Sequence, residues 1–148
     1  MKSNAKEILA NVEAKMAELE AMPTWRNRKY LRISGVCDEL SIFDWWNNNL
    51  SMTQLKDMRK FLKEAIKLGY TGYVCFKVGS TGCANGMWAH KEESTNGYSP
   101  DGDFIYKSFT PEYNYWSVCK DGEIFPCRDE FDTIKTIKQF EALVAGLE

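Results

Sequence analysis

The stretch from residue 69 to residue 127 constrains the fold most, because aromatic residues and glycines alternate along it. It holds twelve of the twenty aromatic residues, and seven of the ten glycines lie between Gly69 and Gly102. The aromatic residues come in short runs, for example at 73–76 and 104–106, with glycines between the runs. Short β-prone runs separated by turn residues predict a meandering antiparallel sheet. Loops and outward-facing rings of such a sheet are suited to hold a ligand or a partner.

Five strands are expected in this region, at residues 73–78, 87–91, 104–109, 113–120 and 123–127. Asp121 and Gly122 form the two-residue turn between the last two strands, which places Val118 opposite Phe125. The same register puts Cys119 and Cys127 on opposite faces of the sheet, so these two thiols cannot bond to each other.

Two helices are predicted before the sheet. Residues 4–21 show helical apolar spacing after Asn4, which is a suitable N-cap, and Pro23 ends the pattern. Residues 51–68 begin with the cap Ser51 and end at Gly69. A short strand is expected at residues 30–33, and three consecutive asparagines at 47–49 read as a break.

A final helix is expected to open at Asp132 or Thr133, with Phe140 and Val144 facing inward. We therefore predict a single α+β domain over residues 1–148. Its antiparallel sheet has about five or six strands, and two to four helices (N-terminal, central and C-terminal) pack on one face.

Composition places the chain among ordinary globular proteins, with 44% hydrophobic and 27% charged residues. The sequence lacks an apolar run long enough for a membrane span, and residues 1–7 lack a signal-peptide core, so cytoplasmic residence is expected. The odd number of cysteines argues against a complete disulfide framework and favours free thiols. These cysteines are Cys37, Cys75, Cys83, Cys119 and Cys127.

The loop at residues 79–86 is the most suggestive local motif. Its small residues and three glycines allow backbone amides to converge on an anion, as in phosphate-binding loops. It lacks the lysine and the following helix of a nucleotide-binding loop, so a glycine-rich connector is the simpler interpretation. If the loop does bind a nucleotide-like or phosphorylated ligand, the contact residues are Ser80, Thr81, Asn85 and His90.

A thiol enzyme based on Cys83 and His90 is a third hypothesis. A nucleophile and its base need only spatial proximity, and His90 is the only histidine. However, Cys83 has no flanking basic cluster to activate it, which favours a buried thiol and a half-exposed strand histidine. The cysteine spacings do not match a zinc knuckle, so neither a metal nor a cofactor is expected.

The net charge of −2 at pH 7 is unevenly distributed. Arginines and a lysine interleave with aromatics at residues 25–30, lysines repeat along one face of the central helix, and residues 111–148 are acidic. Cationic and aromatic groups together suit an acidic partner such as nucleic acid or a protein patch. The adjacent tryptophans near residue 45 cannot both face one core. The candidate partner-binding residues are Trp25, Arg26, Arg28, Lys29, Trp45, Trp46, Lys60 and Lys63.

In overall style the chain resembles the small accessory proteins of phages and mobile elements. No shared motif assigns a role to a particular residue. Such proteins are single α+β domains, rich in aromatics and asparagine and without catalytic signatures, and they often occlude a host protein or sequester a ligand. The resemblance implies a non-enzymatic binding protein that inhibits a host nucleic-acid-handling or defence complex by protein–protein contact. Direct nucleic-acid contact and a homo-oligomer seam are equally compatible with the exposed aromatics.

Overall fold

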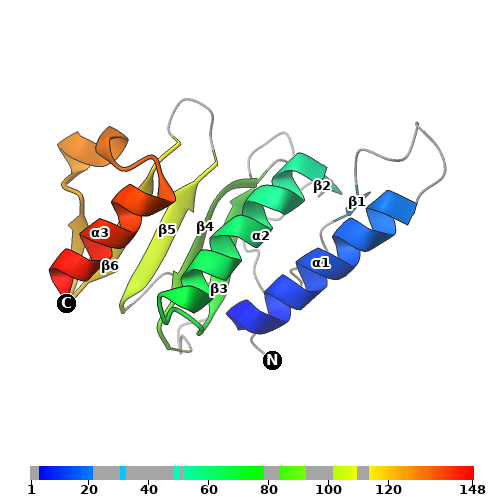
Figure 1. Cartoon of the computed structure of the whole chain (residues 1–148), viewed down its shortest axis with the longest axis horizontal. Helices are drawn as coiled ribbons and strands as arrows, with labels where there is room; N and C mark the ends of the chain where they lie inside the picture. The colour runs from blue at the N-terminus through cyan, green and yellow to red at the C-terminus, as the bar shows by residue number, and fades with distance from the viewer. Residues whose placement is uncertain are drawn as a thin grey trace.

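In the residues that it describes, the computed structural model has three α-helices and a five-stranded antiparallel sheet, which confirms the predicted α+β class (Figure 1). The structure describes residues 4–21, 31–32, 49–50, 52–78, 84–92, 102–109 and 114–148.

The sheet is a meander, because its spatial order follows the chain order. Each neighbouring pair is antiparallel, as the alternation of aromatic runs and glycines predicts. The strands are β3 (Val74–Val78), β4 (Ala84–His90), β5 (Phe104–Ser108), β6 (Trp116–Lys120) and β7 (Glu123–Phe125).

The last hairpin has the predicted register. Val118 pairs with Phe125, and the turn residues Asp121 and Gly122 have φ angles of 54° and 83°. Positive φ at both turn positions matches the twist of the flanking strands. Cys119 is buried whereas Cys127 is exposed, and both are free thiols, as predicted. Cys127 lies beyond β7, which ends at Phe125, so its predicted pairing with Trp116 across the strands does not form.

The first two helices also follow the sequence prediction. Helix α1 (Ala5–Ala21) begins after Asn4, whose Oδ1 accepts a hydrogen bond of 3.0 Å from the backbone N–H of Glu7. Helix α2 (Met52–Lys67) is followed by Gly69 at φ 90°, a conformation that ends helices. None of the described helices combines the length and apolar character that a membrane crossing requires.

The predicted start of the last helix was wrong. A 3-10 helix occupies Arg128–Thr133, and α3 (Ile137–Leu147) begins several residues later. Thr136 sets this start, because its hydroxyl accepts from the backbone N–H of Gln139 while the Gln139 side chain accepts from the backbone N–H of Thr136. This reciprocal capping box satisfies the backbone amides of Thr136 and Gln139 and marks the start of α3.

A second, two-stranded sheet joins β1 (Leu31–Arg32) to β2 (Asn49–Leu50). The first strand falls inside the predicted strand at residues 30–33. The second was missed, because consecutive asparagines were read as a break, whereas backbone pairing with Arg32 holds Asn49 in a strand.

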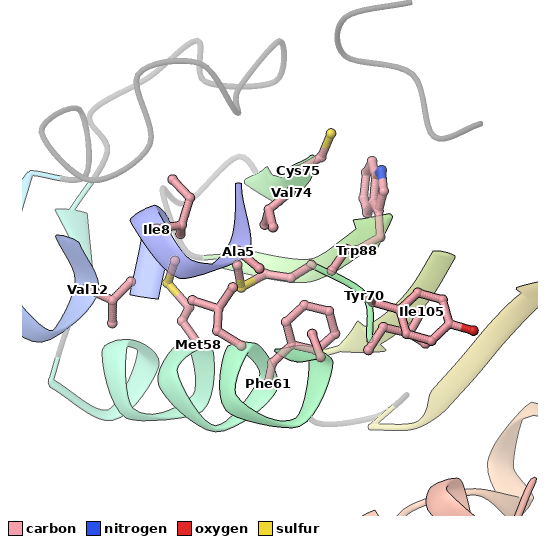
Figure 2. Packing of buried hydrophobic residues seen from close by; sticks show 14 of the residues in the cluster. Ala5, Ile8, Val12, Met58, Phe61, Tyr70, Val74, Cys75, Trp88 and Ile105 are labelled. Atoms are coloured by element: carbon pink, nitrogen blue, oxygen red, sulfur yellow. The ribbon is translucent and has the colours of Figure 1, made fainter. Parts of the chain in front are cut away.

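The core lies between the helices and one face of the large sheet. Cross-strand pairing places Ala89, Ile105 and Val118 on this face, and all three are buried. Figure 2 shows Phe61 pointing from α2 toward the sheet, whereas Trp88 points away from that helix. Helix α1 runs beside α2 (Figure 1) and adds its apolar side to the same core.

Trp116 connects the sheet with two helices. Its ring stacks on Phe61 of α2, with centroids 5.8 Å apart, and on Phe140 of α3, with centroids 4.9 Å apart. Because both helices contact the same side chain, α2 and α3 lie on the same face of the sheet. This arrangement is compatible with the predicted one-sided packing of the helices.

The opposite face carries a row of aromatic side chains. Trp88 packs on Tyr106 at 5.8 Å and Tyr106 on Tyr115 at 6.1 Å between ring centroids. The row explains Gly86 on β4, because a Cβ there would lie 2.5 Å from the Tyr106 hydroxyl oxygen. Aromatic packing over a glycine of a neighbouring strand is a known way to fill such a gap.

Substitution Trp116→Ala should lower the free energy of unfolding by about 3–5 kcal/mol, because it removes the ring between two helices and leaves a cavity. Urea denaturation followed by circular dichroism measures this loss. Ile124→Ala on β7 is the control, since Ile124 is 49% exposed and should change stability by less than about 0.5 kcal/mol. A loss below about 1 kcal/mol for Trp116→Ala would contradict the role of this stack.

Candidate functional site: a lysine-lined pocket

A cavity of about 330 Å³ lies where α2, β5, β6 and the start of α3 meet. Among the described residues, four lysines and one aspartate line it, so the charge of this described lining is predominantly positive. We call it the lysine pocket. Its charged lining residues are Asp57, Lys60, Lys107, Lys135 and Lys138.

The apolar part of the pocket comes from the aromatic core. Phe61 and Trp116 are buried and line the cavity, while Phe109 and Ile137 are partly buried at its side. Flat rings at the wall of a cavity offer stacking area as well as hydrophobic contact. The pocket therefore joins an apolar wall to a cationic lining.

Helix α2 contributes one wall because Asp57, Lys60 and Phe61 are spaced three and four residues apart. Side chains at this spacing lie on the same side of a helix. Phe61 points into the core, and Asp57 and Lys60 lie nearer the solvent. The helix is anchored by its apolar face, so these two charges are held at the edge of the cavity.

The start of α3 forms the opposite wall. The backbone N–H of Trp116 donates to the carbonyl of Ile134 at 2.8 Å, which ties this segment to β6. The capping box then fixes Thr136, and Lys135 and Lys138 flank it at the cavity. A helix N-terminus carries a partial positive charge, which reinforces the charge of the lysines.

Lys107 lies deepest among the lysines, because it is on the core face of β5. It pairs with Trp116 across the strands, and its Nζ lies 5.6 Å from the centroid of the Trp116 ring. The ammonium also donates to the Ser108 carbonyl at 3.2 Å. Burial lowers the pKa of Lys107 to about 8, and the nearby charge of Lys60 acts in the same direction, although Asp57 opposes it.

Asp57 responds to the same surroundings in the opposite way. Loss of hydration in the cavity raises the pKa of its carboxyl, although the side chain remains partly open to solvent and Lys107 and Lys60 pull the pKa down. For both groups desolvation outweighs their mutual attraction, so each is shifted toward its neutral form. An acid and an amine displaced in this way within one cavity are typical of functional sites.

One predicted partner-binding residue, Lys60, lines the lysine pocket. Lys63 is exposed on the same helix but is not part of the lining. The other predicted partner-binding residues lie outside the described residues, so this surface stays a prediction. These residues are Trp25, Arg26, Arg28, Lys29, Trp45 and Trp46.

The predicted ligand loop is described only at its end. Ser80, Thr81 and Cys83 lie outside the described residues, and Asn85 is placed in β4 by its backbone alone. His90 is placed in full, and it differs from the expected half-exposed histidine.

His90 is 2% exposed, and its Nδ1–H donates to the Tyr73 carbonyl at 2.6 Å. It pairs with Phe104 and therefore lies on the aromatic face, away from the lysine pocket. Roles for Cys83 and His90 in catalysis or ligand contact stay predictions. Within the described ranges no three His, Cys, Asp or Glu side chains gather to hold a metal ion.

Sequence reasoning missed most of the lysine pocket. Lys107 could have been recognised, because strand alternation places it on the same face as Ile105 and therefore among core residues. Lys135 and Lys138 gave no such signal, since their position depends on where α3 starts.

A second charged cluster joins α2 to α3 beside the pocket. Lys67 and Glu141 form an ion pair of 2.8 Å, and Glu64 shares a hydrogen bond with Glu141. Burial raises the pKa of Glu64, with a further increase from the charge of Glu141. Glu64 is 6% exposed and its Oε1 has no hydrogen-bond partner, so ionisation of this residue is costly.

Comparison of the chain with known proteins gives no match to a family model, to a curated protein or to a solved structure. The functional conclusions below therefore rest on the geometry of this molecule.

Substitution Glu64→Gln should stabilise the protein at pH 7 by on the order of 1 kcal/mol, or about 3 °C in Tm. Because the pKa of Glu64 is raised in the folded state, its contribution to stability falls as pH rises through that pKa. The neutral amide removes this loss and can still donate to Glu141. Thermal unfolding at pH 4 and pH 7 measures the effect, which should shrink at pH 4.

The control for this substitution is Glu18→Gln, which neutralises an exposed carboxylate that pairs with Lys15 at 3.2 Å. A surface pair of this kind should contribute less than about 1 kcal/mol. A variant Glu64→Gln that is less stable than the wild type at pH 7 would show that the buried carboxylate is favourable there.

Proposed function

We propose that this protein is a binding protein for a small anionic ligand of the phosphorylated or nucleotide-like class, held in the lysine pocket. The observation that carries the proposal is the convergence of four lysines from α2, β5 and the start of α3 on one cavity of about 330 Å³. Cavities of roughly 300–1,000 Å³ with a few convergent polar groups are typical of small-ligand sites.

The charges of the lining favour an anion over a neutral ligand. The described lining contains Asp57 as its only carboxylate, against Lys60, Lys107, Lys135 and Lys138. Bringing like charges together is unfavourable, and an anionic ligand would relieve this repulsion. A group with two or more negative charges would contact lysines from both walls at once.

The apolar wall favours a ligand that also carries a flat or hydrophobic part. Phe61 and Trp116 are held in the aromatic stack, so their positions do not depend on the ligand. A preformed wall of this kind reduces the entropy lost on binding. A nucleotide combines both features, since it has an aromatic base and a phosphate chain.

This proposal keeps the ligand class that the sequence suggested and changes its site. The expected contacts at residues 79–86 fall largely outside the described residues, whereas Lys60 is shared with the predicted partner surface.

A second candidate function is contact with an acidic macromolecule through α2. Lys56, Lys60 and Lys63 are exposed along one side of the helix, and Lys67 continues the row while pairing with Glu141. This lysine row supports contact with an acidic partner, and the predicted role as a cytoplasmic inhibitor of a host nucleic-acid-handling or defence complex would use this surface. It ranks second because solvated lysines on a helix need no partner.

Adenosine diphosphate should bind the wild-type protein in isothermal titration calorimetry, and Lys138→Glu should weaken this binding at least tenfold. Loss of one charge-assisted contact costs roughly 1.5–3 kcal/mol, and reversal of the charge adds repulsion. Lys63→Glu is the matched control, because it changes the net charge equally on an exposed residue outside the lining. Equal weakening by both variants would contradict binding in the pocket, and greater weakening by Lys63→Glu would favour the lysine row on α2.

Binding of naphthalene disulfonate, whose charge is constant with pH, should weaken as pH rises from 7 to 9. Lys107 is protonated below its pKa of about 8 and loses its charge above it, so its attraction for the anion disappears in this range. Fluorescence titration of the wild type and of Lys107→Met measures the effect. The pH dependence should be much smaller in the variant, and an identical dependence would exclude Lys107 as a contact.

A further inference from the structure

We propose that Lys107 captures a carbonyl group of its ligand as a reversible imine, so that the ligand class is an anionic aldehyde or ketone. This inference deepens the proposed function and rests on it, because the same pocket holds the anionic part of the ligand. The geometry that supports it is a lysine lining an aromatic-walled cavity, with a carboxyl group from a neighbouring element in the same lining.

The position of the Lys107 amine suits nucleophilic attack. The side chain projects from the core face of β5 beside the Trp116 ring. Three further lysines line the same cavity, and none of them can neutralise the charge of a protonated Lys107. Amines that form imines in proteins are activated in this way, by apolar surroundings or by a neighbouring cation. Lys60 is that cation here, because its charge disfavours the ammonium form of Lys107.

The protonation of Lys107 agrees with this geometry. Since burial lowers the pKa of Lys107 to about 8, the side chain holds roughly a hundredfold more neutral amine at pH 7.5 than an ordinary lysine. The charged groups that face it are Asp57 and Lys60 on α2 and Lys135 and Lys138 at the start of α3. The negative charge of a bound anion would favour the ammonium form of Lys107 and partly offset the lowering of its pKa.

The chemical step balances without an oxidant or a reductant. The Nζ lone pair forms a bond to the carbonyl carbon, and the C=O π electrons move to the oxygen. The nitrogen then gives up one proton and the oxygen takes up one, which yields a neutral carbinolamine and restores the nitrogen lone pair. The hydroxyl then leaves as water after protonation, and the nitrogen lone pair forms the C=N bond. One water is released for each imine formed, and hydrolysis reverses the reaction.

Asp57 is the described lining residue suited to supply the proton that removes this water. Its carboxyl lines the same cavity, and desolvation raises its pKa above that of an ordinary aspartate, although the side chain is open to solvent on one side. Asp57 is therefore expected to influence the rate of imine formation more than its extent.

The test treats the full-length protein with pyridoxal 5′-phosphate as an anionic aldehyde probe, reduces the imine with cyanoborohydride and locates the label by peptide mass spectrometry. Labelling of Lys107 should be roughly tenfold faster than that of Lys63, an exposed lysine outside the pocket. Adenosine diphosphate should protect Lys107 and not Lys63. Unphosphorylated pyridoxal should label Lys107 more slowly, because it lacks the phosphate that the other lysines would hold.

Two variants make the test specific. Lys107→Arg keeps a positive charge in the pocket but cannot form an imine, so it should abolish the fast-labelled site. Asp57→Asn should slow labelling of Lys107 severalfold and flatten its dependence on pH. Circular dichroism confirms that each variant is folded.

The outcomes separate the two proposals. If adenosine diphosphate binds in the pocket but pyridoxal phosphate labels the lysines evenly, the imine inference is overturned and the proposed function stands. If adenosine diphosphate neither binds the protein nor protects Lys107 from labelling, both the proposed function and the imine inference that rests on it are overturned. Fast, protectable labelling at Lys107 alone supports both.

Discussion

The stack of Phe61, Trp116 and Phe140 is the interaction on which the rest of the structure depends. Trp116 is 2% exposed and lies between a ring from α2 and a ring from α3, so three elements distant in the sequence meet at one side chain. A buried aromatic contributes large apolar area and a defined geometry. This ring therefore links the positions of both helices to β6.

The lysine pocket follows from this arrangement. The Trp116 ring lies between Phe61 of α2 and Phe140 of α3. The lysine pocket is the cavity beside this stack, lined by α2, β5, β6 and the start of α3. Lys107, paired across the strands with Trp116, projects into this space from the core face of the sheet. Its stem is covered by apolar surface while its amine reaches the cavity, which is why burial and not a specific partner dominates its pKa. The chemistry proposed for the site is therefore a consequence of packing.

Much of the fold could be predicted from the sequence, because its signals are local. The Asp121–Gly122 turn determines the hairpin register, Asn4 and Gly69 mark helix ends, and short aromatic runs separated by glycines predict the meander. The start of α3 was missed because several polar residues compete as caps and the reciprocal bonds of Thr136 decide between them.

The site could not be predicted to the same extent. Its lining comes from three separate segments, and a lysine in a strand or near a helix start carries no motif. Lys60 was selected for its place in a lysine row, not for the cavity. His90 was expected to be half-exposed because strand alternation alone does not reveal what covers the second face of a sheet, and the structure shows it buried against Tyr73 and Phe104.

Mapping of the binding site by nuclear magnetic resonance tests the central claim most directly. Backbone amide and tryptophan indole signals would be followed during titration with adenosine diphosphate. The account predicts shifts concentrated at Lys60, Lys107, Trp116 and the first turn of α3, with α1 signals unchanged. Shifts confined to α1 or to the aromatic face around Trp88, or none at millimolar ligand, would contradict an anion-binding pocket between α2 and α3.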